Sequence, residues 1–309
     1  FAHNTQRDLW MLGNAKEALR DGWAARAGDI FYPEPNPYFN VNVSDVNSLM
    51  LSGGRVEAIH FDDAYISPDT MRSYGFGPES GGGTLGKVYQ KLYESRQKDR
   101  NRLMAAFTKK RVSELQGYMR QESHWENNWR SLQRYCRSKM IFPDRGNVRS
   151  FLWTITDGTG QRKRQIFFVD HHGWDTHDSD NEHQAGYLSD SLDAFQNALE
   201  VMGIADKVTT FTISDFGRSL SPNGAGTDHG WGSHAFVMGG SVKGGEIYGR
   251  MPQLVPDSPD AWSDRMIPTT AMESYLATIV KWFGATEKEL DGIFPNRHAF
   301  GMTDMGFLR

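Results

Sequence analysis

The side chains that could carry out chemistry are concentrated in three short segments of this chain. Six of the ten histidines lie between residues 171 and 234, interleaved with aspartates. Imidazole and carboxylate groups together are the ligand set for zinc, manganese and iron. The pattern therefore predicts metal-assisted chemistry. The segments read Val169-Asp170-His171-His172-Gly173-Trp174-Asp175-Thr176-His177, Ser214-Asp215-Phe216-Gly217-Arg218 and Gly226-Thr227-Asp228-His229-Gly230-Trp231-Gly232-Ser233-His234.

In the first segment, Asp175 and His177 are the expected metal ligands. They are two positions apart and face the same side of an extended chain. His171 and His172 are consecutive and point to opposite sides, so at most one of them is expected to face the site. His183 falls at the start of the next predicted helix, and this position explains the residue better than a role in the site does.

The other two segments complete the expected ligand set. Asp215 follows a buried strand, where an unpaired carboxylate is costly, so it needs a metal ion or an arginine as its partner. Arg218 is either that partner or a group that binds an anionic substrate through its planar guanidinium. His229 and His234 are expected ligands on a glycine-rich loop, and Asp228 is either a ligand or the carboxylate that orients His229.

The elements that must position these groups follow an α/β pattern. The apolar run 166–169 is typical of a strand buried on both faces, and the β-branched run 208–213 of a second strand. Apolar residues recur at helical spacing from 188 to 202. This predicts a βαβ unit with parallel strands, whose carboxyl ends bring the segments to one edge of the sheet.

Along the whole chain, we expect an α/β fold with a mostly parallel sheet flanked by helices and an inserted helical subdomain. The length of 309 residues and 38% hydrophobic residues suit one large domain. Residues 1–80 are assigned to the N-terminal part of the α/β core, 81–145 to the helical insertion, and 146–309 to the C-terminal core that carries the histidines and aspartates. Because the chain starts at Phe1 without a methionine, we expect that a segment precedes it.

Composition excludes several classes of function. A net charge of −4 gives no reason to expect nucleic acid or an anionic membrane as the main partner. No apolar run approaches the roughly 18 residues of a membrane span. The single cysteine, Cys136, excludes an internal disulfide. The oligomeric state is not predicted.

The motifs resemble a bacterial family of exported proteins that is known mainly as a domain of unknown function. The resemblance rests on Gly-Trp-Asp-Thr-His, Ser-Asp-Phe-Gly-Arg, Gly-Thr-Asp-His-Gly-Trp-Gly-x-His and Phe-Val-Met-Gly-Gly, and covers most of residues 150–300. Near the start of the chain, His-Asn-x-Gln with a following Gly-Trp is similar to an earlier segment of that family. The resemblance implies a periplasmic or extracellular protein.

That family is similar in turn to the sulfatase and alkaline phosphatase superfamily. The resemblance implies an alkaline-phosphatase-like core that holds one or two divalent ions, zinc first, with calcium, manganese or iron as alternatives. It also implies hydrolysis of phosphate or sulfate esters. Asp175, His177 and either His229 or His234 match the ligands of the first ion in order, and Asp215 matches a ligand of the second.

Two departures from the superfamily pattern stand out. Phe216 occupies the position of a histidine ligand in that pattern, so the second ion site lacks one of its ligands. The superfamily nucleophile opens a helix, and Thr5, just after Asn4, is the only residue that could correspond, as a poor match. No Cys-x-Pro-x-Arg sulfatase signature occurs, which counts against a sulfatase with a modified cysteine.

The sequence thus favours a metal-dependent hydrolase acting on a small anionic or glycan-ester substrate, in which Arg218 neutralises charge developing on the anion. One alternative is a non-catalytic metal-binding or structural protein on the same fold, which Phe216 favours. Another is a redox protein with a His/carboxylate iron site, which has the ligand types without supporting spacing. The expected site comprises Arg218 and Thr5 for catalysis and Asp175, His177, Asp215, His229 and His234 for the metal.

Overall fold

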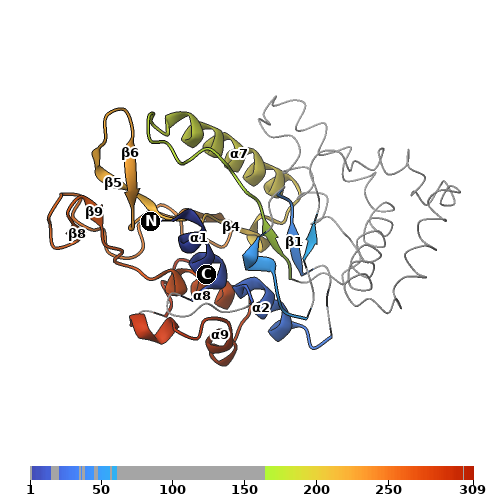
Figure 1. The fold of residues 1–309 in the computed structure, drawn as a ribbon. Helices are drawn as coiled ribbons and strands as arrows, with labels where there is room; N and C mark the ends of the chain where they lie inside the picture. Colours follow the sequence, from blue (N-terminus) through green and yellow to red (C-terminus); the bar gives the residue numbers. More distant parts are fainter. Residues whose placement is uncertain are drawn as a thin grey trace, which may run out of the picture. The chain divides into compact units, whose positions relative to one another are not determined.

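The computed structural model describes residues 2–14, 21–34, 36, 39–44, 48–55, 58–60, 164–301 and 303–309 (Figure 1). The chain divides into two compact units. The predicted helical insertion at 81–145 and the domain boundary at 146 lie outside the described residues. Unit 1 comprises Phe1–Pro35, Ser48–Arg55 and His171–Arg309, and unit 2 comprises Asn36–Asn47 and Val56–Asp170.

The described part of unit 2 is a short parallel sheet. β1 (Asn40–Asn42) lies between β2 (Ile59–His60) and β3 (Ile166–Phe168) and is parallel to both. Val41 is fully buried and Phe168 is 8% exposed, as expected for parallel strands covered on both faces. The strand predicted at 166–169 is therefore confirmed, with its end at Phe168.

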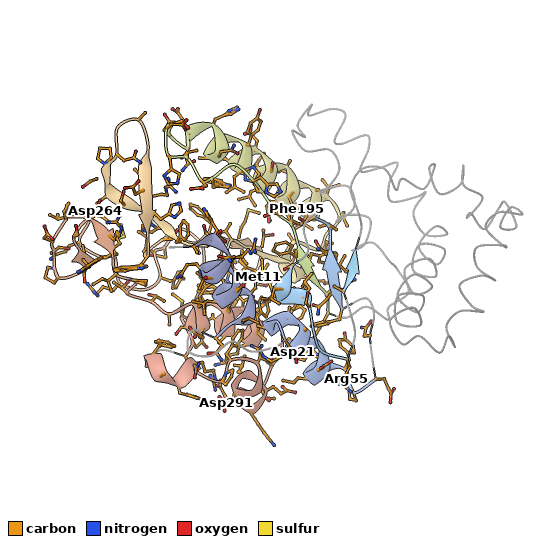
Figure 2. The ribbon with its side chains drawn as sticks, viewed as in Figure 1. Met11, Asp21, Arg55, Phe195, Asp264 and Asp291 are labelled. Carbon is orange, nitrogen blue, oxygen red and sulfur yellow. The ribbon has the colours of Figure 1, made fainter. Side chains whose placement is uncertain are left out.

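Unit 1 is built from helices packed around an apolar core, to which α1 contributes Met11 (Figure 2). Gly13 ends α1 in the left-handed conformation (φ 59°), and its N–H bonds to the carbonyls of Leu9 and Trp10. None of the helices described has the length and apolar composition needed to span a membrane. The helices are α1 (His3–Leu12), α2 (Trp23–Phe31), α7 (Glu182–Val201), α8 (Met272–Trp282) and α9 (Glu287–Ile293), with 3-10 helices η1 (Leu49–Leu51), η3 (Ala205–Lys207) and η4 (Arg297–Phe300).

The strands of unit 1 form antiparallel pairs, β4 with β7, β5 with β6 and β8 with β9. The strand predicted at 208–213 is present as β4. Among the described residues it is hydrogen-bonded to β7 and not to β3, so the pairing expected within a βαβ unit is not found there. The mostly parallel sheet stays a prediction. The strands are β4 (Thr209–Phe211), β5 (Gly217–Pro222), β6 (Thr227–Gly230), β7 (Val237–Gly239), β8 (Ala261–Trp262) and β9 (Arg265–Met266).

The β5–β6 hairpin is the element that organises the histidine and aspartate segments. Arg218 and His229 are opposite each other in its register, and cross-strand neighbours project to the same face. Gly226, immediately before β6, has no room for a side chain, because a Cβ there would lie 2.4 Å from the carbonyl carbon of His177. The absence of a side chain lets the loop before α7 pack directly against the hairpin.

Candidate functional site

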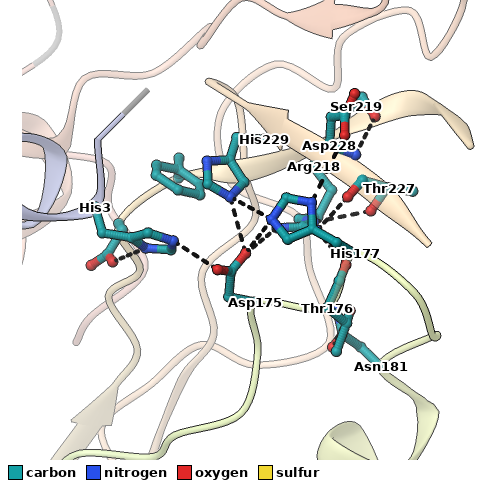
Figure 3. A network of polar contacts seen from close by, with 12 residues as sticks. His3, Asp175, Thr176, His177, Asn181, Arg218, Ser219, Thr227, Asp228 and His229 are labelled. Atoms are coloured by element: carbon teal, nitrogen blue, oxygen red, sulfur yellow. Dashed lines mark hydrogen bonds and ion pairs between the residues drawn. The ribbon is translucent and has the colours of Figure 1, made fainter. Parts of the chain in front are cut away.

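Four segments of unit 1 deliver polar side chains to one cluster (Figure 3). Asp175 and His177 come from the loop before α7, Arg218 from β5, His229 from β6, and His3 from the first position of α1. All of these except His3 were expected from the sequence.

The centre of the cluster is a triangle of three possible ligand atoms. Asp175 Oδ1 lies 3.0 Å from His177 Nε2 and 3.0 Å from His229 Nε2, and the two nitrogens are 3.0 Å apart. Zinc takes nitrogen and oxygen ligands at about 2.0–2.1 Å, and the ligand atoms of one tetrahedral ion are about 3.4 Å apart, so Asp175, His177 and His229 would hold a divalent ion. The side chains therefore fit a divalent ion with only small adjustments.

The loop that carries two corners of this triangle is fixed by its own hydrogen bonds. The Thr176 hydroxyl donates to Asn181 Oδ1 at 3.0 Å, just before α7, and the Thr176 N–H donates to the carbonyl of Trp174 at 3.0 Å. Because Thr176 lies between Asp175 and His177, these bonds hold both side chains toward β6.

Arg218 is the residue that holds Asp175 in place. Its Nη1 donates to Asp175 Oδ1 at 2.9 Å, its Nε to the Thr227 hydroxyl at 3.0 Å, and its Nη2 to the carbonyls of Thr176 and Thr227. Four of the five N–H groups of the guanidinium are thus engaged. The alternative that Arg218 pairs with Asp215 is corrected by the structure, because its ion pair is with Asp175.

His3 links the two aspartates. Its Nδ1 is 2.8 Å from Asp215 Oδ2 and its Nε2 is 3.0 Å from Asp175 Oδ2. The hydrogen bond to Asp215 raises the pKa of His3, and burial opposes this only in part. Burial alone would raise the pKa of the Asp175 carboxyl, but hydrogen bonds from Arg218, His229 and His3 hold that pKa well below its usual range.

Phe216 forms an apolar wall of the cluster. It is 8% exposed, and its ring centroid lies 4.6 Å from that of His3 and 4.1 Å from that of His229. The phenyl ring of Phe216 therefore packs against two imidazoles of the cluster.

Two of the expected site residues are not brought into the cluster. His234 is exposed, and no described side-chain contact joins it to the other histidines. Thr5 is exposed on α1, where its N–H donates to Asn4 Oδ1. Asp215 faces His3 and not the triangle. Asp228 lies nearer His177, with 3.8 Å between its Oδ1 and Nδ1 of that ring.

The remaining histidines in and just after the first segment have other partners. Nδ1 of His171 accepts a hydrogen bond from Nε1 of Trp174 at 2.8 Å. His183 lies in the first turn of α7, as expected from helix entry, and its ring contacts Tyr187. His172 is exposed.

Comparison with known proteins locates the family likeness on part of the chain. Residues 154–270 match the model of a family described as "Protein of unknown function (DUF1501)". This segment contains Asp175, His177, Arg218 and His229, whereas His3 lies outside it. No curated protein and no solved structure matched the chain.

Proposed function

We propose that this protein is a metal-dependent hydrolase of phosphate or sulfate esters, with one divalent ion, zinc by preference, held by Asp175, His177 and His229. The observation that carries the proposal is the 3.0 Å triangle of ligand atoms from the α7 loop and β6. Two imidazole nitrogens lie at the same distance from one carboxylate oxygen and from each other, and a cation would bind all three atoms at once.

The side chains around the triangle have distinct roles in this proposal. When bound, the ion supplies a Lewis acid that polarises the ester oxygen and lowers the pKa of an attacking hydroxyl or water. Arg218 keeps Asp175 ionised and oriented, and the one guanidinium N–H without a partner among the described residues is the donor left for a bound anion. The substrate is a small anionic or glycan ester, and a periplasmic or extracellular location belongs to the same proposal.

A second candidate is a non-catalytic protein that uses the same ion for structure. Phe216 packs against His3 and His229, at the position where the superfamily resemblance implies a histidine ligand for a second ion. Arg218 is largely engaged by the protein itself, and Thr5 lies outside the cluster. These observations favour a single ion without a dedicated nucleophile.

Elemental analysis combined with two assays separates the candidates. We expect about one zinc, manganese, iron or calcium ion per chain in the purified protein, and turnover of an aryl phosphate or aryl sulfate that is lost in Asp175→Asn and His229→Ala. Metal without turnover on either ester would favour the second candidate. A metal-free protein that takes up no ion from solution would contradict both.

A further inference from the structure

His3 has a position in the cluster that the proposed triangle does not explain. It lies 172 residues from Asp175 and 212 residues from Asp215 along the chain, yet each of its ring nitrogens faces one of these carboxylates. The Nδ1 contact is 2.8 Å and the Nε2 contact is 3.0 Å. One imidazole thus bridges a carboxylate of the proposed metal site and a carboxylate outside it.

Ring contacts on one side orient this imidazole, whose side chain is 42% exposed. The His3 ring lies 4.6 Å from the buried ring of Phe216 and 4.8 Å, edge-on, from the ring of His229. Rotation of His3 to another side-chain conformation would break both ring contacts and both polar contacts. A ligand that is already held in place loses little conformational freedom when an ion binds.

The geometry points to His3 as a further ligand of the proposed ion, with Asp215 as the carboxylate that positions it. This inference rests on the proposed metal site. Histidine ligands usually donate their second ring N–H to a carboxylate, which fixes the tautomer and makes the ligating nitrogen more basic. Nδ1 of His3 is 2.8 Å from Asp215 Oδ2, so with an ion bound Nδ1–H would donate to Asp215 and Nε2 would be the ligating nitrogen.

The distances allow this arrangement. His3, Asp175 and His229 can each offer one ligand atom, and the three atoms lie within 4.8 Å of one another. Ligand atoms of a tetrahedral zinc site are about 3.4 Å apart, so closing the widest separation takes no more than about 1.4 Å. Together with His177, these side chains would provide three imidazoles and one carboxylate to the ion.

The rival explanation is purely structural. A protonated His3 held between Asp175 and Asp215 would fasten α1 to the rest of unit 1 without any metal. Both explanations predict that changing His3 affects stability, but only the ligand role predicts that the His3 ring itself coordinates the ion. The test must therefore measure metal binding directly.

Zinc titration of the chelator-stripped full chain provides the main measurement. We expect Asp215→Asn to weaken zinc binding by about 10- to 100-fold, as removal of a carboxylate behind a histidine ligand does. His3→Gln should weaken it at least as much, and Asp215→Glu should restore part of the loss. Both weakened variants should also lose most of the rise in melting temperature that zinc gives the wild type.

A matched carboxylate–histidine pair serves as the control. Asp291 on α9 (Figure 2) accepts a 2.7 Å contact from His298 Nε2 in η4. Asp291→Asn and His298→Gln remove the same chemistry from a pair that is not in the cluster. They should leave zinc affinity unchanged, even where they lower the melting temperature.

A second measurement on the wild type does not depend on the folding of any variant. In the Co²⁺-loaded protein, each histidine ligand contributes one hyperfine-shifted, exchangeable ring N–H proton to the NMR spectrum. Three such signals are expected from His3, His177 and His229, and two would overturn the inference.

The outcomes separate this inference from the proposed function. If His3→Gln and Asp215→Asn bind zinc as tightly as the wild type while Asp175→Asn does not, His3 is structural and the metal site stands without it. If the wild type binds no ion, the proposed function is wrong and this inference is wrong with it.

Discussion

At the scale of single residues, Asp175 is the most connected group of the site. Its Oδ1 contacts His177, His229 and Arg218, and its Oδ2 contacts His3. One negative charge therefore organises groups from four segments. An ionised carboxylate with these partners is stabilised far more than one in water, which explains its depressed pKa.

Asp175→Asn should remove zinc binding and also destabilise the metal-free protein. The amide keeps the shape but cannot satisfy Arg218 as a charged partner. Because Asp175 is half-exposed, we expect the free energy of unfolding to fall by only about 1 kcal/mol. Urea denaturation of the chelator-stripped proteins measures this change, and a loss of several kcal/mol would mean that the carboxylate is effectively buried.

The metal-free protein should show a pH dependence that comes from His3. Its pKa is raised above the ordinary 6.5, first through the hydrogen bond to Asp215. The stabilisation is therefore fully present below pH 6.5 and is lost as the pH rises through the raised value. The melting temperature of the metal-free wild type should fall as the pH rises above 6.5, and the fall should be smaller in His3→Gln. An identical slope in both proteins would contradict this assignment.

The sequence predicted part of this residue-level arrangement. Asp175, His177, Asp215, His229 and His234 were expected to lie together where the predicted strands end. The structure brings Asp175, His177 and His229 together, whereas Asp215 faces His3 and His234 is exposed. His3 was not expected as a site residue. Its only signal was the His-Asn-x-Gln likeness, and its contacts depend on how α1 packs, which local sequence does not encode. Whether Arg218 pairs with Asp175 or with Asp215 depends on the register of the β5–β6 hairpin, which local sequence does not encode either.

At the scale of elements, close backbone approach determines the geometry of the site. The loop before α7 touches the β5–β6 hairpin at Gly226, where a side chain has no room. Short strands and the helix at 188–202 were predictable from local periodicity. The pairing of β4 with β7 was not, because a three-residue, half-buried strand carries no pattern that selects its partner.

Gly226→Ala should therefore weaken zinc binding without unfolding the protein. The new Cβ would lie 2.4 Å from the carbonyl carbon of His177, which forces the α7 loop away from β6 and widens the triangle. We expect at least a tenfold loss of zinc affinity, about 1.4 kcal/mol of binding free energy.

Gly186→Ala is the matched control for that substitution. Gly186 lies within α7, and a Cβ there meets nothing within 4 Å. Alanine should stabilise the helix by roughly 0.5–1 kcal/mol and leave zinc affinity unchanged. Equal zinc affinities for Gly226→Ala and Gly186→Ala would show that the loop is not held by this contact.

At the scale of the whole molecule, the site is assembled from distant parts of the chain. The segment that matches the family of unknown function, residues 154–270, supplies Asp175, His177 and His229, whereas α1 lies outside it. The α/β class and the alkaline-phosphatase-like core remain predictions, because the parallel strands described are β1–β3 and no solved structure matched. Long-range sheet order depends on contacts that periodicity cannot specify.

Zinc should consequently slow the hydrogen exchange of separate segments of unit 1 at the same time. Hydrogen exchange of α1, of the α7 loop and of β6 should slow in parallel when zinc is added, because one ion would link all three. Exchange in α9 should not change. Protection confined to the α7 loop and β6 would show that α1 is not joined to the ion.

The bridge from His3 to Asp215 also has a consequence for folding kinetics. It closes a span of 212 residues, and contacts of such long range form slowly because most of the chain must be ordered first. During synthesis, α1 leaves the ribosome long before its partners exist. The proposed zinc site should therefore be among the last features to form in refolding, and the onset of tight zinc binding should lag behind the recovery of helical signal.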